Sequence, residues 1–431
     1  MRRLLPVVDL ARFRQVALPV FTGTLFRTSR WAMRERRERR AGMMQKMKST
    51  AARAARGMMQ RGGRAVHDAQ QARRRRLVTA NIRAALIKDH KRWCSDFTPP
   101  AAAIDAARQF LSESFGGYDD IRCHELYWRI TDTLDPAFIP WDVFYRKIEP
   151  TLNAMSYVPV LTDKNVHYTL PVAPYLPEPV LHIIRGDLYL PGFTRISDSE
   201  LDRVFGASRA EFIVKPSVEH GGGRDLRVMD GAGAASFIKA MLSDRRSRSD
   251  ADWVIQRPLD QCTEMARFNP SSVNTYRIMM MRTGQEIVCL SSVLRTGRSG
   301  MRIDNQAAGG LAGGIDDGRL RGRAMDHELR FYEVHPDSGV PFVGELPAYH
   351  TAVELCRNLH RMLPWFDLVS WDVAIDLRYD PRVIEFNTAS QEINFHQMNN
   401  GPLFGPEGGA VMSALLRRLA IMPLDPNFAT A

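Results

Sequence analysis

Two short apolar segments separated by a turn constrain the fold of this chain more than any other feature. SWDVAID (370–376) and RVIEFN (382–387) each carry an acid within a run of apolar and β-branched residues, which is typical of strands. The residues between them include Asp380 and Pro381, which favour a turn. The sequence therefore predicts an antiparallel hairpin with one acid on each strand.

The register of this hairpin determines which side chains meet. A loop over residues 377–380 places Asp376 opposite Pro381, and the same register places Asp372 opposite Glu385. Facing side chains on one side of an antiparallel pair have Cβ atoms about 5 Å apart. We therefore expect the two carboxylates to lie side by side on one face of the hairpin.

A third oxygen-bearing side chain joins them, because Asn387 lies two residues after Glu385 and points to the same face. Two facing carboxylates repel each other unless a cation lies between them. Carboxylate and amide oxygens suit Mg²⁺ better than zinc. Alternatively, the acids lie on a solvent-facing hairpin and pair with a neighbouring arginine, Arg378 or Arg382. From the hairpin alone, both interpretations stand.

A glycine-rich turn follows another predicted strand. EFIVKPSVEHGGGRDLRVM (211–229) reads as a strand with Lys215 near its end, the glycine turn and a second strand. Glycines allow backbone N–H groups to approach phosphate closely, and the lysine supplies positive charge. The segment lacks the G-K-[ST] of a Walker A loop and the strand-to-helix setting of a dinucleotide fingerprint. It indicates either a phosphate-binding lid or a plain hairpin.

The positive charge of the chain is confined to its first part. Residues 1–95 contain 25 Lys/Arg and 5 Asp/Glu, a net charge of +20, so the total of +11 leaves −9 for residues 96–431. WAMRERRERR (31–40) and QQARRRRL (70–77) have too few large apolar residues to form a core. We expect residues 1–95 to form a helical or disordered arm, which is solvated or contacts an anionic surface, a membrane or a protein. Aromatic residues for base stacking are scarce, so nucleic acid is an unfavourable partner.

The cysteines and the hydropathy of the chain favour a cytoplasmic protein. No apolar stretch near the start approaches the roughly 20 residues that a membrane-spanning helix needs. Five scattered cysteines show no disulfide or metal-binding spacing. We expect a reducing compartment, with the basic arm as the only candidate contact to a membrane surface.

The main body reads as an α+β fold with largely antiparallel sheets, because short β-type runs alternate with helical segments from about residue 150 onwards. Residues 96–150 are expected to form a helical connector. The stretch 136–153, which overlaps the end of this connector, is interrupted by proline. The main domain is expected to span 151–425.

The order of these pieces resembles the ATP-grasp superfamily. VKPSVEHGGGRDLRVM resembles its lysine and glycine-rich lid, WVIQRPLD its adenine-binding linker strand, and the acidic hairpin its magnesium site. VNTYRIMM (273–280), IDNQAAGGLAGGID (303–316) and EFNTASQEINFHQMNNGPLF (385–404) are similar to the sugar-transfer-associated ATP-grasp group, which is related to α-L-glutamate ligase-like proteins. The resemblance implies two α+β subdomains that sandwich ATP, with a hinge near residues 256–260.

The resemblance also implies a nucleotide site. Lysines would contact the phosphates, a lid would cover them, and the linker strand would meet adenine. The residues implied are Lys164, Lys215, His220, Gly221, Gly222, Gly223, Gln256, Arg257, Pro258 and Leu259, with Glu264 as a candidate ribose partner. The alternative for Lys164 is an ordinary surface lysine.

Metal and phosphoryl contacts are implied for the hairpin and a neighbouring strand. Mg²⁺, as two ions, would bind Asp372, Glu385 and Asn387. Arg277 would act as the catalytic cation at the transferring phosphoryl group. Its apolar strand neighbours would suit a structural ion pair equally well.

The acceptor pocket is the least defined part of the resemblance. Asn305, Gly309 and Gly310 would line it, although the glycine-rich stretch 297–316 would serve equally well as a flexible connector. TASQE (388–392) either touches the acceptor or only leads the chain away. His396 receives no role, because a lone histidine in a polar segment is more often not catalytic.

These residues together imply an ATP-dependent carboxylate–amine ligase, or a carboxylate–thiol ligase, that acts through an acylphosphate on small-molecule substrates. The name of the group points to polysaccharide or cell-envelope metabolism. The same residues would also serve a phosphotransferase that stops after phosphorylating a small molecule. A non-catalytic nucleotide-binding scaffold is the third interpretation.

Overall fold

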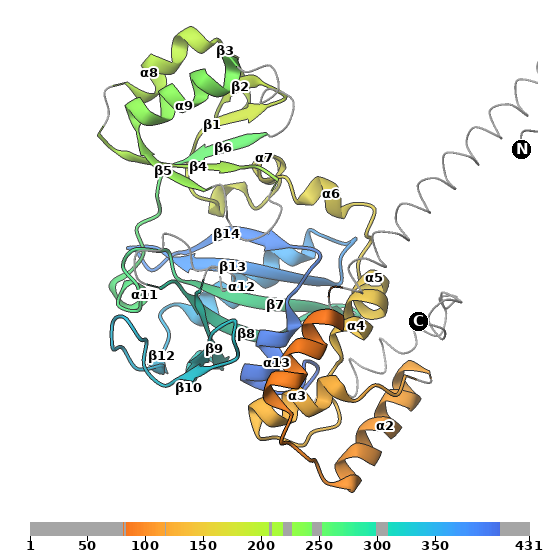
Figure 1. Cartoon of the computed structure of the whole chain (residues 1–431). Helices are drawn as coiled ribbons and strands as arrows, with labels where there is room; N and C mark the ends of the chain where they lie inside the picture. Colours follow the sequence, from red (N-terminus) through yellow and green to blue (C-terminus); the bar gives the residue numbers. More distant parts are fainter. Residues whose placement is uncertain are drawn as a thin grey trace, which may run out of the picture. The chain divides into compact units, whose positions relative to one another are not determined.

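The computed structural model describes most of the chain after residue 80 (Figure 1). The described residues are 81, 83–116, 118–206, 209–218, 226–243, 252–298 and 309–405. All but the last residues of the predicted basic arm lie outside them, so its predicted form and its partners stay predictions.

One antiparallel sheet has the strand order β3-β2-β1-β6-β4-β5. Its strands are β1 (Pro179–Ile184), β2 (Asp187–Leu190), β3 (Thr194–Ile196), β4 (Glu211–Pro216), β5 (Arg227–Asp230) and β6 (Trp253–Gln256). Helices α8 (Leu201–Phe205) and α9 (Gly231–Ser243) share a buried core with one face of this sheet, to which Phe212, Val214 and Ile255 contribute (Figure 1). Because strand side chains alternate between faces, the neighbours of these apolar residues point the other way.

The opposite face of this sheet carries polar side chains. Lys215 on β4 pairs with Val254 on β6, which pairs in turn with His182 on β1. These three residues therefore lie in a row on one face. The short helix α7 (Lys164–His167) contributes Asn165, whose side-chain oxygen lies 2.8 Å from Nδ1 of His182. This contact places α7 against the polar face.

A second antiparallel sheet has the order β11-β10-β9-β8-β7-β13-β14, and β12 pairs with β10. Its strands are β7 (Thr275–Thr283), β8 (Glu286–Thr296), β9 (Leu311–Asp316), β10 (Arg319–Met325), β11 (Phe331–Tyr332), β12 (Val343–Glu345), β13 (Leu368–Ile375) and β14 (Pro381–Asn387). Helix α12 (Tyr349–Arg361) packs on one face through the main apolar core, which includes Tyr276, Ile278 and Trp371. The α+β class predicted from the sequence is confirmed.

The other face of this second sheet packs against the helices that precede it and one that follows it. They are α2 (Ala101–Phe115), α3 (Arg122–Thr131), α4 (Trp141–Val143), the π-helix η1 (Phe144–Ile148), α5 (Glu149–Leu152) and α13 (Ile393–Asn400). Met279, Met281 and Leu368 contribute to this core. The proline-interrupted connector is therefore helical from Trp141 to Leu152, with one π-helical turn in the middle. The remaining short helices are α6 (Val158–Leu161), η2 (Ala173–Tyr175), η3 (Asp198–Glu200) and α11 (Thr263–Ala266).

Part of the glycine-rich stretch 297–316 is a strand, so the flexible-connector alternative is wrong for residues 311–316. β9 pairs with β8 and β10, and a Cβ atom on Gly314 would lie 2.5 Å from Oδ1 of Asn400 and 2.8 Å from the carbonyl oxygen of Asn399. The missing side chain lets α13 rest directly on the sheet. Here glycine provides close packing rather than flexibility.

The acidic hairpin forms as predicted at its centre but not at its turn. Asp372 pairs with Glu385, which confirms the predicted facing pair. The predicted turn is wrong, because Ile375 and not Asp376 faces Pro381. The register shifts by one between Val373 and Asp372, where Ile384 is the extra residue of a β-bulge. The bulge restores the pairing that the turn alone would have missed.

Among the described residues, no helix is both long and apolar enough to cross a bilayer.

Candidate functional site

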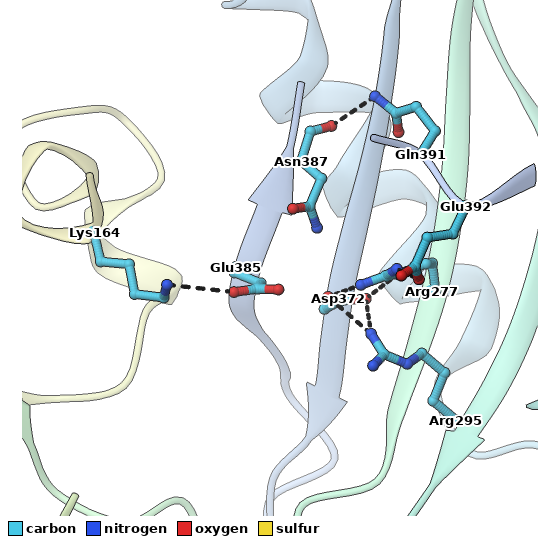
Figure 2. A network of polar contacts seen from close by, with 8 residues as sticks. All are labelled: Lys164, Arg277, Arg295, Asp372, Glu385, Asn387, Gln391 and Glu392. Atoms are coloured by element: carbon cyan, nitrogen blue, oxygen red, sulfur yellow. Dashed lines mark hydrogen bonds and ion pairs between the residues drawn. The ribbon is translucent and has the colours of Figure 1, made fainter. Parts of the chain in front are cut away.

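A row of ionic side chains crosses three neighbouring strands of the second sheet. Asp372 on β13 pairs with Arg277 on β7 and with Glu385 on β14, so the three side chains share one face (Figure 2). Nε and Nη2 of Arg277 donate to the two carboxylate oxygens of Asp372 at 2.8 and 2.7 Å. This two-pronged geometry is the strongest arrangement available to an arginine and a carboxylate. It joins the predicted catalytic cation directly to a predicted metal ligand.

Arg295 on β8 is a member of the site that the sequence analysis did not find. Its Nη1 lies 3.3 Å from Oδ2 of Asp372, and the residue is 7% exposed. Asp372 is itself only 3% exposed, so two buried guanidinium groups hold one buried carboxylate. An arginine near the end of an otherwise apolar strand was the available signal. Neither Arg378 nor Arg382 takes this role, since Arg382 donates to Asp376 instead.

The other end of Arg277 reaches the TASQE segment. Nη1 of Arg277 donates to Oε2 of Glu392 at 2.6 Å (Figure 2). Burial alone would lower the pKa of Arg277, but the carboxylates of Asp372 and Glu392 raise it well above its usual value. Arg277 is therefore a permanent cation that bridges a buried acid and a half-exposed one. The carboxylate of Glu392 therefore belongs to the ionic cluster, and its contact with an acceptor stays a prediction.

The segment that carries Glu392 is held by the helical connector. The carboxylate of Glu149 accepts the backbone N–H groups of Ser390 and Gln391, and the hydroxyl of Tyr145 accepts that of Glu392. Burial raises the pKa of Glu149 to about 8. Gln391 is fully buried and donates to backbone carbonyl oxygens, including that of Asn387 at 3.0 Å, so it is structural.

Lys164 approaches the row from the side of edge strand β14. Its ammonium lies 3.7 Å from Oε2 of Glu385 (Figure 2). Its backbone N–H donates to the carbonyl oxygen of Ser217, just after β4. The lysine is 6% exposed, which excludes the alternative of an ordinary surface lysine. Lys164 and Lys215 both act on the buried His167, whose pKa is lowered to about 4, first by burial and then by these two cations. The two predicted phosphate-binding lysines therefore lie near one another.

The predicted adenine hinge follows β6. Gln256 is buried and donates through its side chain to the hydroxyl of Tyr168, while the backbone N–H of Arg257 donates to Glu178. Glu264, the candidate ribose partner, accepts from the hydroxyl of Tyr379, which lies in the turn of the acidic hairpin, at 2.8 Å. Pro258 and Leu259 follow β6, and their role at adenine stays a prediction.

Five of the predicted site residues belong to the segments 219–225 and 299–308, which the structure does not describe. The lid residues His220, Gly221, Gly222 and Gly223, and the acceptor-pocket residue Asn305, lie outside the described residues. Gly309 and Gly310 are described and immediately precede β9; Gly309 has a φ of +95°, which glycine adopts readily.

His396 lies close to the ionic cluster but is neutral. Burial, and after it the nearby cation of Arg277, lowers its pKa to about 3. Its Nδ1 lies 2.9 Å from the hydroxyl of Ser291 on β8. The imidazole thus links α13 to the sheet.

Residues 144–408 match the sugar-transfer associated ATP-grasp family, which covers more than half of the chain. The chain belongs to this family. The resemblance predicted from the sequence is confirmed. ATP-grasp proteins are typically ATP-dependent carboxylate–amine ligases that use Mg²⁺.

Solved structures of ATP-grasp ligases are similar to this ATP-grasp protein at low identity. A D-cycloserine synthetase is 13% identical with a TM-score of 0.37, and the match covers 62% of this chain and 73% of that one. The ATP-grasp ligase PsnB with a minimal precursor is 14% identical with a TM-score of 0.33, over 62% and 64%. A D-alanine–D-alanine ligase from Bacillus anthracis is 15% identical with a TM-score of 0.32, over 61% and 66%. A search of curated proteins returned no significant match.

The magnesium that this family uses fits the donor set of the row. Within the described ranges, no group of three His, Cys, Asp or Glu side chains is arranged to hold a metal ion. The donor set of the row consists of two carboxylates and one amide. Nδ2 of Asn387 is buried without a hydrogen-bond partner, and exchanging the two ends of this amide puts an acceptor oxygen in its place. The side chain of Glu385 is 27% exposed and more available than Asp372, which its arginines hold. Hard oxygen ligands of this kind suit Mg²⁺.

Proposed function

We propose that this protein is an ATP-dependent carboxylate–amine ligase that forms an acylphosphate on a small-molecule acid. The family match supports the reaction class, and one observation carries the assignment of residues. That observation is the row Arg277–Asp372–Glu385, which sets a permanent cation beside the oxygen ligands expected to face ATP.

Each side chain has a separate task in this proposal. Lys164 and Lys215 hold the phosphates of ATP, with His220 to Gly223 as the lid and residues 256–259 against adenine. Arg277 and Arg295 hold the acceptor carboxylate and stabilise the charge that develops as it attacks the γ-phosphate. Since both guanidinium groups are buried and fixed in place, they require little reorganisation during the reaction.

Asp372, Glu385 and Asn387 are the residues that would hold Mg²⁺, as two ions. The metal, when bound, screens the negative charge of the phosphates. The acylphosphate then reacts with an amine, whose nitrogen forms the new bond as phosphate leaves. Asn305, Gly309 and Gly310 would line the acceptor pocket. The acceptor belongs to polysaccharide or cell-envelope chemistry if the name of the family describes this chain.

A phosphate-release assay tests the proposal. Purified protein is incubated with Mg-ATP and pools of carboxylic acids and amines, and ADP, phosphate and amide are measured. We expect all three products together, because amide formation releases the phosphate that the acid first received. ADP and a phosphorylated product without free phosphate would instead identify a phosphotransferase.

The matched variants are Glu385→Gln and Glu345→Gln. Glu385→Gln should remove turnover and keep the fold, because its side chain is partly exposed and its ion pair with Lys164 is long. Glu345 pairs with Arg319 on the exposed edge of the sheet and should not affect turnover. Wild-type turnover in Glu385→Gln would refute the proposed metal site.

A further inference from the structure

Glu392 is the exposed end of a chain of charges that is otherwise buried. Its side chain is 51% exposed, whereas those of Arg277 and Asp372 are 9% and 4% exposed. Nε and Nη2 of Arg277 donate to the buried Asp372, and its Nη1 donates to Glu392 at 2.6 Å. Of the two carboxylates that pair with Arg277, Glu392 is the one exposed to solvent.

The backbone around Glu392 is fixed although its carboxylate is half exposed. Ser390 and Glu392 have φ values of +61° and +55°, which side-chain-bearing residues rarely adopt. The N–H groups of the segment are bound by Glu149 and Tyr145. Backbone strain of this kind persists only where the surroundings enforce it, and it is common next to ligands. The carboxylate is therefore held at a defined place beside Arg277.

Carboxylate activation brings a competing anion to the same guanidinium group. Both the acceptor carboxylate and its acylphosphate are anions, and Nη1 of Arg277 faces the more exposed side of the cluster. When a substrate anion binds there, Glu392 loses this ion pair and presents a negative charge next to the activated carbon. A cation at that place restores the balance of charge.

We propose that Glu392 is the amine subsite of the enzyme: it exchanges Arg277 for the ammonium group of the second substrate. This inference rests on the proposed ligase function and extends it to the chemical class of the nucleophile, a primary amine that is cationic at neutral pH. A thiol or an uncharged amide would leave Glu392 without a partner.

The proposed step is balanced in protons and electrons. The ammonium group gives one proton to the carboxylate of Glu392, and the freed lone pair forms the C–N bond with the acyl carbon. The C–O bond to phosphate breaks, and phosphate leaves with the electron pair. The second proton lost by nitrogen protonates the departing phosphate, while Glu392 returns its proton to solvent.

A comparison of uncharged and cationic nucleophiles distinguishes an amine-binding role of Glu392 from a purely structural one. Hydroxylamine is uncharged at neutral pH and traps an acylphosphate as a hydroxamate, which iron(III) reveals by colour. Ethanolamine, putrescine and lysine are cationic and form amides. Wild type, Glu392→Gln and Glu392→Asp are compared with the acids glutamate, aspartate and glucuronate, and KM and kcat are measured for each nucleophile.

We expect Glu392→Gln to lower the ratio of amide to hydroxamate formation at least tenfold, mainly through a higher KM for the cationic amine. Glu392→Asp should restore part of that ratio. The inference is overturned if both nucleophiles lose activity together or if neither does, and thermal unfolding checks that the variants fold. A wild-type protein that forms no hydroxamate with any of these acids would count against the ligase function itself, and the inference would fall with it.

Discussion

Replacing Asp372 by asparagine should destabilise the fold and not only stop the reaction. Asp372 is 3% exposed and accepts two hydrogen bonds from Arg277, with Arg295 3.3 Å away. Asparagine removes the buried negative charge that the two guanidinium groups share, although Arg277 keeps Glu392, and it turns an amide N–H₂ towards a donor. Removing one partner of a buried ion pair costs about 3–5 kcal/mol, which is a large part of the roughly 5–15 kcal/mol that stabilises a typical domain.

Urea unfolding followed by far-UV circular dichroism measures this cost. Glu385→Gln is the matched change on the same face, and we expect it to cost about 1 kcal/mol or less, because its ion pair with Lys164 spans 3.7 Å and is partly solvated. Asp202→Asn, at an exposed ion pair with Lys239, is the control for removing an aspartate. If Asp372→Asn unfolded within about 1 kcal/mol of Glu385→Gln, the two arginines would not depend on Asp372 and the reasoning would fail.

Three further predictions follow from other contacts. The folded protein favours the neutral form of Glu149, because burial raises its pKa to about 8, so wild type loses stability as pH rises from 4.5 towards 8. Glu149→Gln has no such group and should become more stable than wild type over this range, by about 5 kcal/mol at most. Chemical denaturation of both proteins at several pH values tests this. Arg277→Lys should lower kcat/KM about 10²–10³-fold, since lysine cannot reproduce the two-pronged contact, whereas Arg295→Lys should cost about tenfold or less. Gly314→Ala should lower the unfolding free energy by about 1–3 kcal/mol, because its Cβ would lie 2.8 Å from the carbonyl oxygen of Asn399; equal stability would contradict the close packing of α13.

Local sequence patterns were sufficient for several strands and for the central pair of the site. β7 spans the predicted residues 275–283, and Asp372 faces Glu385 as the alternation of the hairpin indicates. The hairpin prediction nevertheless contained an error. Its turn is one residue out of register, and the bulge at Ile384 corrects the difference before the acids are reached. Strand alternation alone carries no sign of such a bulge.

The rest of the site depends on pairings between distant segments. Arg277 lies 95 positions before Asp372, and the register of β7 against β13 decides that they meet. Arg295 and Glu392 join the cluster for the same reason, the first through β8 and the second through a segment held by Glu149. A single sequence gives the face of each strand but not the register between strands that are far apart. The residues that the prediction missed are those that only long-range packing brings to the site.

The bulge at Ile384 divides the hairpin into two registers, one next to the turn and one at the two acids. Beyond the bulge, residues 376–380 form the connection, and a shorter or longer loop there can be grafted without moving Glu385. Deleting Ile384 would merge the two registers into one regular ladder, in which Glu385 still faces Asp372 and Val383 still faces Val373. The loop is therefore a place where a probe or an affinity tag can be attached without changing the register of the two acids.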